Sequence, residues 1–175
     1  KIKKNPINFD ILNFKKTLDT NLEIILHGNK DLRSKEILLK KILIKEKNNI
    51  LESKNLRISR DQKIKSIDKI DLDYLDVNSL KNTLSISRKD KDYYLVSKSF
   101  NASKIIDNLL KPKKKSKYID NFLSNFILNI KINETFLDQD HIIDDLRGYL
   151  SFKNGEIIEA NLDSSFSKNK KIKLT

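Results

Sequence analysis

Apolar side chains recur at every second position along most of this chain, and that alternation constrains the fold more than any other feature. In the stretch "FLSNFILNIKINETF", polar residues such as Asn129 and Lys131 separate the apolar ones. A period of two is typical of a strand that turns one face to a core and the other to water. The apolar residues of this stretch that share one parity are Phe122, Phe126, Leu128, Ile130, Ile132 and Phe136.

Shorter runs with the same alternation lie on both sides of this stretch, separated by brief connections rich in Asn, Asp and Lys. They predict a mainly β fold, a meander of about eight to ten strands that pair mostly antiparallel. Because the chain has only three Gly, we expect Asn to supply most backbone positions with positive φ. The groups that share parity are Leu22, Ile24 and Leu26; Leu38, Ile42 and Ile44; Ile70, Leu72 and Tyr74; Leu84 and Ile86; Tyr94, Val96 and Phe100; Leu150 and Phe152; Ile158 and Leu162.

One segment, "NASKIIDNLLKPKKKSK", departs from the period of two and shows a narrow helical stripe instead. Asn101 or Ser103 can cap the start of this helix, and Pro112 ends it. A helix this short is not stable alone, so we expect it to dock on the sheet. Residues 76–82 could form a second, shorter helical turn. The docking face of the main helix consists of Ile105, Ile106, Leu109 and Leu110.

The composition narrows the choice of partner. The chain has 36 basic and 24 acidic residues and a net charge of +12, which raises nucleic acid or an anionic membrane surface as a partner. Most basic residues are Lys, whose codons are A/T-rich like those of the abundant Ile and Asn. Arg, which pairs best with phosphates and base edges, is scarce, so we expect no nucleic-acid partner. The absence of Cys excludes disulfides and thiol chemistry.

Polar clusters that could carry chemistry are few. Carboxylates and a histidine in "DQDHIIDD" could bind a divalent metal, but their spacing fits no metal-binding loop, so we interpret 138–145 as a solvated connection. His27 is interpreted as a turn residue and the lysines of 111–117 as a solvated basic loop. No nucleophile elbow or phosphate loop is present. We therefore predict no enzymatic activity, no catalytic residue, no metal site and no cofactor. The carboxylates and the histidine of segment 138–145 are Asp138, Asp140, His141, Asp144 and Asp145.

The alternation leaves the partner of the apolar face open. Two sheets could close on each other as a structural or adhesive β-sandwich, or one long sheet could keep its apolar face for a guest molecule. A basic nucleic-acid-binding module is a third, weaker alternative. Because the chain has no Met and its alternation still runs at Leu174, we expect it to be an internal segment of a longer protein.

A resemblance favours the second of these alternatives. Residues 64–175 are similar to the AsmA-like family, in particular to the central region of its YhdP-type members. The resemblance lies in the order of a Tyr-containing strand, a Phe-x-Ala-Ser junction, a short helix, a long alternating strand and a Gly-containing strand pair, whereas residues 1–63 match only in strand-turn character. These pieces are Tyr94 to Phe100, Ala102 and Ser103, Ile105 to Leu110, Phe126 to Ile132, and Leu146, Gly148, Leu150, Gly155 and Ile157.

The resemblance implies a long antiparallel sheet, twisted and curled into an open groove, with the short helix packed on it. Such a segment would belong to a periplasmic β-groove domain of the Gram-negative cell envelope, anchored in the inner membrane by a helix outside this sequence. It would shield phospholipid acyl chains during transport toward the outer membrane, and flanking segments of the same protein would be its partners. The implied groove lining is Ile70, Leu72, Tyr74, Leu84, Ile86, Phe126, Leu128, Ile130, Ile132, Leu150, Phe152, Ile158 and Leu162.

Overall fold

The structure is a computed structural model that describes residues 7–16, 19–33, 35–110, 125–138, 140–153, 156–167 and 170–174. The alternating runs form strands, which confirms the mainly β prediction. The elements are β1 (Asn8–Phe9), η1 (Asp10–Leu12), β2 (Phe14–Lys15), β3 (Leu22–Lys30), β4 (Ile37–Glu46), β5 (Asn49–Ile58), β6 (Ile64–Ser66), β7 (Lys69–Leu75), β8 (Lys81–Lys89), β9 (Asp92–Asn101), α1 (Ser103–Leu110), β10 (Phe126–Phe136), β11 (Ile142–Lys153), β12 (Glu156–Ser167) and β13 (Lys170–Leu174).

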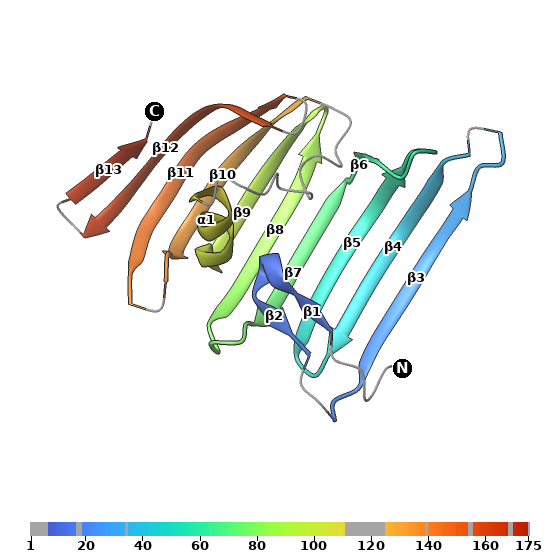
Figure 1. Ribbon diagram of the computed structural model, residues 1–175, viewed down its shortest axis with the longest axis horizontal. Coiled ribbons are helices and arrows are strands. Elements are labelled where there is room, and N and C mark those ends of the chain that lie inside the picture. The colour runs from blue at the N-terminus through green and yellow to red at the C-terminus, as the bar shows by residue number, and fades with distance from the viewer. Residues whose placement is uncertain are drawn as a thin grey trace.

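Ten strands lie side by side in one sheet, in the order β13-β12-β11-β10-β9-β8-β7-β5-β4-β3, and β6 pairs with β5 away from this row (Figure 1). Neighbouring strands are antiparallel, as predicted, except that β9 and β10 are parallel. The parallel pair follows from α1, because a parallel neighbour needs a crossover connection. The sheet is not closed into a barrel, so among the described residues β3 and β13 form its two edges.

The register of the strands divides the sheet into an apolar face and a polar face. On the apolar face, a row of paired residues crosses all ten strands and begins at Leu26 of β3. A neighbouring row on the polar face begins at His27 of the same strand. The apolar row is Leu26, Ile42, Ser53, Ile70, Ile86, Leu95, Ile130, Gly148, Leu162 and Leu174. The polar row is His27, Lys41, Lys54, Lys69, Ser87, Tyr94, Asn129, Tyr149 and Asn161.

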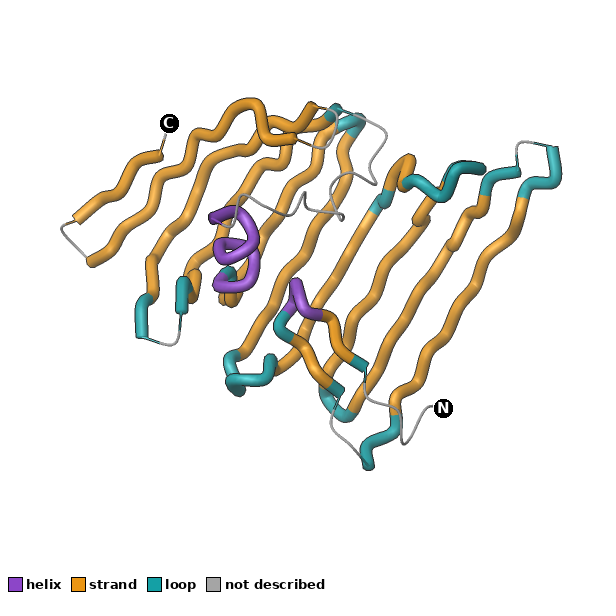
Figure 2. Tube along the Cα trace, in the orientation of Figure 1, coloured by secondary structure: helices purple, strands orange, loops and turns teal. Residues whose placement is uncertain are grey.

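Two small elements lie on the apolar face (Figure 2). Ile105 of α1 packs against a core cluster of Leu84, Phe100 and Ile132, so the predicted docking of the helix is confirmed. The N-terminal hairpin, which we define as residues 7–16 with β1, η1 and β2, packs nearby, and η1 contacts α1. The face is thus covered by local elements rather than by a second large sheet in the part of the chain that the structure describes.

The N-terminal hairpin is held by aromatic packing and two backbone carbonyls. The ring of Phe14 meets Tyr74 edge-on at 5.8 Å, and Phe9 stacks on Phe14 at 5.9 Å. The Tyr74 hydroxyl donates a hydrogen bond of 2.8 Å to the carbonyl of Leu12, and the Val77 amide donates one of 3.0 Å to the carbonyl of Asn13. Burial of Tyr74, with the charge of Asp76 nearby, raises the pKa of its phenol, so the hydroxyl remains a donor at neutral pH.

Bulges shift the side-chain parity that the sequence predicts for β9. Tyr94 and Val96 do not share a face with Phe100, because Lys98 is an extra residue opposite Thr83 and Leu84 of β8. The alternation is therefore inverted on the two sides of Lys98. Tyr94 and Val96 lie on the polar face with 40% and 53% of their surface exposed, whereas Phe100 is in the core.

Two further local predictions are wrong. Residues 76–80 form a turn rather than a helix, and Lys81 and Asn82 already belong to β8. The turn forms because the Asp76 carboxylate accepts hydrogen bonds from the Asn78 and Leu80 amides at 2.8 and 3.0 Å. Asn is also not the main source of positive φ. Among the described residues with positive φ only two are Asn, and the set is Asn13, Asp19, Lys35, Lys47, Asn55, Gln62, Ser79, Asp90, Asp145 and Gly148.

Candidate functional site

The candidate site is the apolar row of the sheet, which we call the apolar strip. It runs perpendicular to the strands, and nine strands at the usual spacing give it a length of roughly 38 Å. Its members are aliphatic except Ser53 and Gly148. We define the apolar strip by the residues whose side-chain burial is described, which are Leu26, Ile42, Ser53, Ile70, Ile86, Leu95, Ile130, Gly148 and Leu162.

No member of the apolar strip is fully buried, whereas several members of the next row toward α1 are. Leu26 exposes 59% of its surface, and Ile42 and Ile70 are half-buried. In the next row, Leu84 and Ile132 fall to 6% and 4% because α1 covers them. The apolar face therefore has a covered part under α1 and the N-terminal hairpin and a partly open part along the strip.

The implied lining residues fall into three groups. Most lie on the apolar face and are half-buried: Ile70, Leu72, Ile86, Phe126, Leu128, Ile130, Leu150 and Leu162. Four are buried in the covered part or in aromatic contacts: Tyr74, Leu84, Ile132 and Phe152. The last, Ile158, exposes 60% of its surface and is an extra residue at a bulge between Ser151 and Phe152 of β11.

An aromatic cluster closes one end of the apolar face at β9, β10 and β11. Phe126 stacks on Phe152 with ring centres 4.7 Å apart, and Tyr93 meets Phe126 edge-on at 5.2 Å. A hollow of about 210 Å³ lies beside the cluster and is also bordered by Lys91, Asp92 and Lys153. Apolar surface and charged side chains, two of them cationic, therefore meet at this end of the strands.

The polar face consists of a lattice of ion pairs and hydrogen bonds between strands. The Glu52 carboxylate lies 3.4 Å from the ammonium of Lys41 and 3.7 Å from that of Lys54. Partial burial raises the pKa of Asp71, but hydrogen bonds from Ser85 and Lys69 and the charges of nearby lysines outweigh it, so the net pKa is lowered. In these pairs the lysine and carboxylate charges neutralise one another.

The polar clusters noted in the sequence do not assemble into a reactive site. Asp138 accepts hydrogen bonds of 2.8 Å from the Asp140 and His141 amides and from the His141 ring, in an exposed loop. No group of three metal-binding side chains occurs in the described residues. His27 lies within β3 at a bulge, not in a turn, so that prediction is wrong. The lysine-rich segment 111–117 lies outside the described residues.

Several residues of the apolar face were missing from the implied lining. Ile42 and Leu95 lie in the apolar strip, and Leu51 lies in the next row toward α1. The alternation placed Ile42 on an apolar face, but Leu51 directly follows Ile50 and Leu95 has the parity opposite to Tyr94 and Val96, so alternation alone did not place these two. Of the docking face, Ile105 packs on the sheet and Ile106 is half-buried, whereas the side chains of Leu109 and Leu110 lie outside the described residues.

The geometry defines an open, single-layered mixed β-sheet with one partly covered apolar face. No family model matches the chain, and neither a curated protein nor a solved structure matches it significantly. Within the described ranges, no helix has the length and hydrophobicity needed to cross a bilayer. The AsmA-like assignment stays a prediction.

Proposed function

We propose that this chain shields the acyl chains of phospholipids on its apolar face, as a non-enzymatic segment of an AsmA-like envelope protein. The proposal includes a periplasmic location, a membrane anchor outside this sequence and transport between the inner and outer membranes. These parts rest on the resemblance of residues 64–175 alone.

The observation that carries the proposal is the partly exposed apolar strip across nine hydrogen-bonded strands. Water contact costs a lipid about 0.8 kcal/mol for each methylene group, so an acyl chain is stabilised by any continuous aliphatic surface. A surface without directional bonds also lets the chain slide. Shielding of this kind requires no catalytic residue.

The first test replaces two exposed members of the apolar face by aspartate. Ile24 and Leu26 expose 42% and 59% of their surfaces, so Ile24→Asp/Leu26→Asp should fold normally. We expect the amount of bound phospholipid to fall roughly tenfold or more, because two carboxylates would have to be desolvated against hydrocarbon. Lipid retained after incubation with phosphatidylglycerol vesicles is measured by native mass spectrometry.

The matched control is Tyr94→Asp/Val96→Asp, which changes two residues at the same spacing and similar exposure on the polar face of β9. This variant should retain lipid like the unaltered protein. Equal loss in both variants, or no lipid on the unaltered protein, would contradict the proposal. Ile130 is less suitable as a test position, since it packs against the core cluster and an aspartate there would unfold the sheet.

A further inference from the structure

Charge is segregated between the two ends of the strands. The basic rim, as we call the end that carries the β3–β4, β5–β6, β8–β9 and β11–β12 connections, has more basic than acidic side chains among its described residues. Its basic residues are Lys30, Arg33, Lys35, Arg57, Arg60, Lys63, Lys65, Arg88, Lys89, Lys91 and Lys153. Its acidic residues are Asp31, Glu36, Asp61, Asp68, Asp90, Asp92 and Glu156.

The opposite end, which we call the acidic rim, carries the β4–β5, β7–β8, β10–β11 and β12–β13 connections and the start of α1. Among the described residues of these connections and the strand ends beside them, acidic residues outnumber basic ones. The acidic residues are Glu46, Asp76, Glu134, Asp138, Asp140, Asp144 and Asp145, and the basic residues are Lys47, Lys81, Lys104, Arg147 and Lys170. The two rims are separated by the length of the strands, roughly 30 Å for nine residues, so at physiological salt they are screened from each other.

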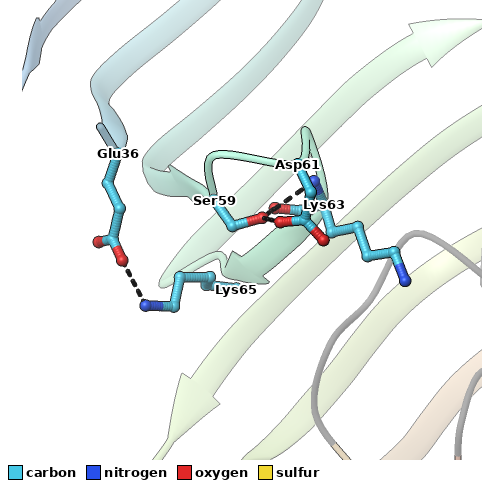
Figure 3. Close-up of polar contacts among 5 residues, drawn as sticks. All are labelled: Glu36, Ser59, Asp61, Lys63 and Lys65. Atoms are coloured by element: carbon cyan, nitrogen blue, oxygen red, sulfur yellow. Dashed lines mark hydrogen bonds and ion pairs between the residues drawn. The ribbon is translucent and has the colours of Figure 1, made fainter. Parts of the chain in front are cut away.

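At the basic rim some cations are paired with acids, whereas Lys63 extends away from the acid beside it. At the β5–β6 connection, Lys65 forms an ion pair of 2.5 Å with Glu36, while the side chain of Lys63 extends away from the turn (Figure 3). The turn itself is fixed by Ser59, whose hydroxyl donates to the Asp61 carboxylate at 2.5 Å and accepts from the Lys63 amide at 3.1 Å. The hydrogen bond from Ser59 lowers the pKa of Asp61, so this carboxyl remains ionised at neutral pH.

At the acidic rim the N-terminal hairpin and α1 cover much of the apolar face, whereas toward the basic rim half-buried aliphatic residues lie beside the aromatic cluster. The N-terminal hairpin and the start of α1 lie beside the acidic rim, where Asn101 and Tyr74 are buried. Toward the basic rim, Leu128 and Leu150 are half-buried, and the hollow beside Phe126 brings Lys91 and Lys153 to the end of the apolar surface. A molecule with an apolar tail on the strip would therefore place its head at the basic rim.

We infer that the ligand is an anionic phospholipid, oriented with its acyl chains on the apolar strip and its phosphate at the basic rim. This inference rests on the proposed function and adds the head-group charge and the polarity of binding. Lysine and arginine near an anionic lipid surface each contribute about 1 kcal/mol, whereas the acidic rim would repel the same head group. The rims thus favour one orientation of the lipid and one class of head group.

The experiment reverses two basic-rim charges and compares them with two reversals at the acidic rim. The basic-rim variant is Lys63→Glu/Lys91→Glu, and the acidic-rim variant is Lys47→Glu/Lys104→Glu. The two variants have the same net charge and differ only in which end of the strands is changed. Each protein is incubated with mixed vesicles of phosphatidylglycerol and phosphatidylcholine, and the ratio of the two retained lipids is measured by mass spectrometry. We expect the basic-rim variant to lower the preference for phosphatidylglycerol roughly fivefold per lysine, and the acidic-rim variant to preserve it.

Two further arms fix the interpretation. Glycerol phosphate, which has the head-group chemistry without acyl chains, should not compete with phosphatidylglycerol, and competition would overturn the inference in favour of a free-anion site. Equal selectivity in both variants would overturn the assignment of the basic rim while leaving lipid shielding intact. Retention of neither lipid by the unaltered protein would overturn the proposed function and this inference together. Circular dichroism should show that both variants stay folded, since all four lysines are exposed.

Discussion

Replacing Gly148 by alanine should lower the free energy of unfolding by about 4 kcal/mol. Gly148 lies in the middle of β11 with φ of +139°, a conformation that residues with a side chain rarely adopt. An added Cβ would lie 1.9 Å from the carbonyl oxygen of Asn161 and 3.0 Å from the Cα of Leu162. Because these are backbone atoms of β12, no change of rotamer relieves the clash, and the strands must separate.

The measurement is urea denaturation followed by circular dichroism, with hydrogen exchange to locate the damage. Amides of β11 and β12 should lose protection in Gly148→Ala before those of β4, β5 and β7 do. The control is Ser151→Ala in the same strand, whose free energy of unfolding should change by less than about 0.5 kcal/mol. A Gly148→Ala protein as stable as this control would show that β11 and β12 do not approach each other as closely as the structure indicates.

The predictable part of this fold came from the alternation, because a strand has a strict side-chain period of two. Ile70, Ile86 and Ile130 were each assigned to an apolar face from their own strand. Antiparallel pairing then brings such residues into one row, and the hydrophobic pattern sets the register. The strip could therefore be predicted in large part without knowing the order of the strands.

Bulges limited the prediction of individual faces. One additional residue inverts the parity of everything that follows it, and Lys98 has no property that marks it as that residue. The same effect occurs in β10, where Thr135 rather than Phe136 is buried with Ile132. The exposed residues Asn133 and Glu134 separate these two buried positions, so the alternation is interrupted although the sequence reads as continuous.

The N-terminal hairpin was not predictable from local pattern. Its strands are two residues long, too short to be stable alone. Its position depends on tertiary contacts, namely Phe14 against Tyr74 and the Tyr74 hydroxyl on Leu12. The segregation of charge between the rims has the same origin, since it appears only when the connections of distant strands are brought to one end of the sheet.

The second large effect is expected at Asn101, where the N-terminal hairpin, the β7–β8 turn and α1 meet. The Asn101 side chain donates a hydrogen bond of 2.5 Å to the Asp76 carboxylate and accepts one of 3.1 Å from the Ser103 amide at the start of α1. Asn101 and Asp76 are both buried. Asn101→Leu keeps the number and branching of the side-chain heavy atoms but removes both bonds, and it should lower the free energy of unfolding by about 3 kcal/mol.

Two comparison variants separate this polar junction from simple packing. Asn133→Leu makes the same substitution at an exposed position of β10 and should change stability by less than about 0.5 kcal/mol. Asn101→Asp should be more destabilising than Asn101→Leu, because it places a second carboxylate against Asp76 instead of an apolar group. If urea denaturation instead shows Asn101→Asp to be the more stable of the two, the contact with Asp76 does not hold α1 in place, and the covered part of the apolar face depends on the packing of Ile105 alone.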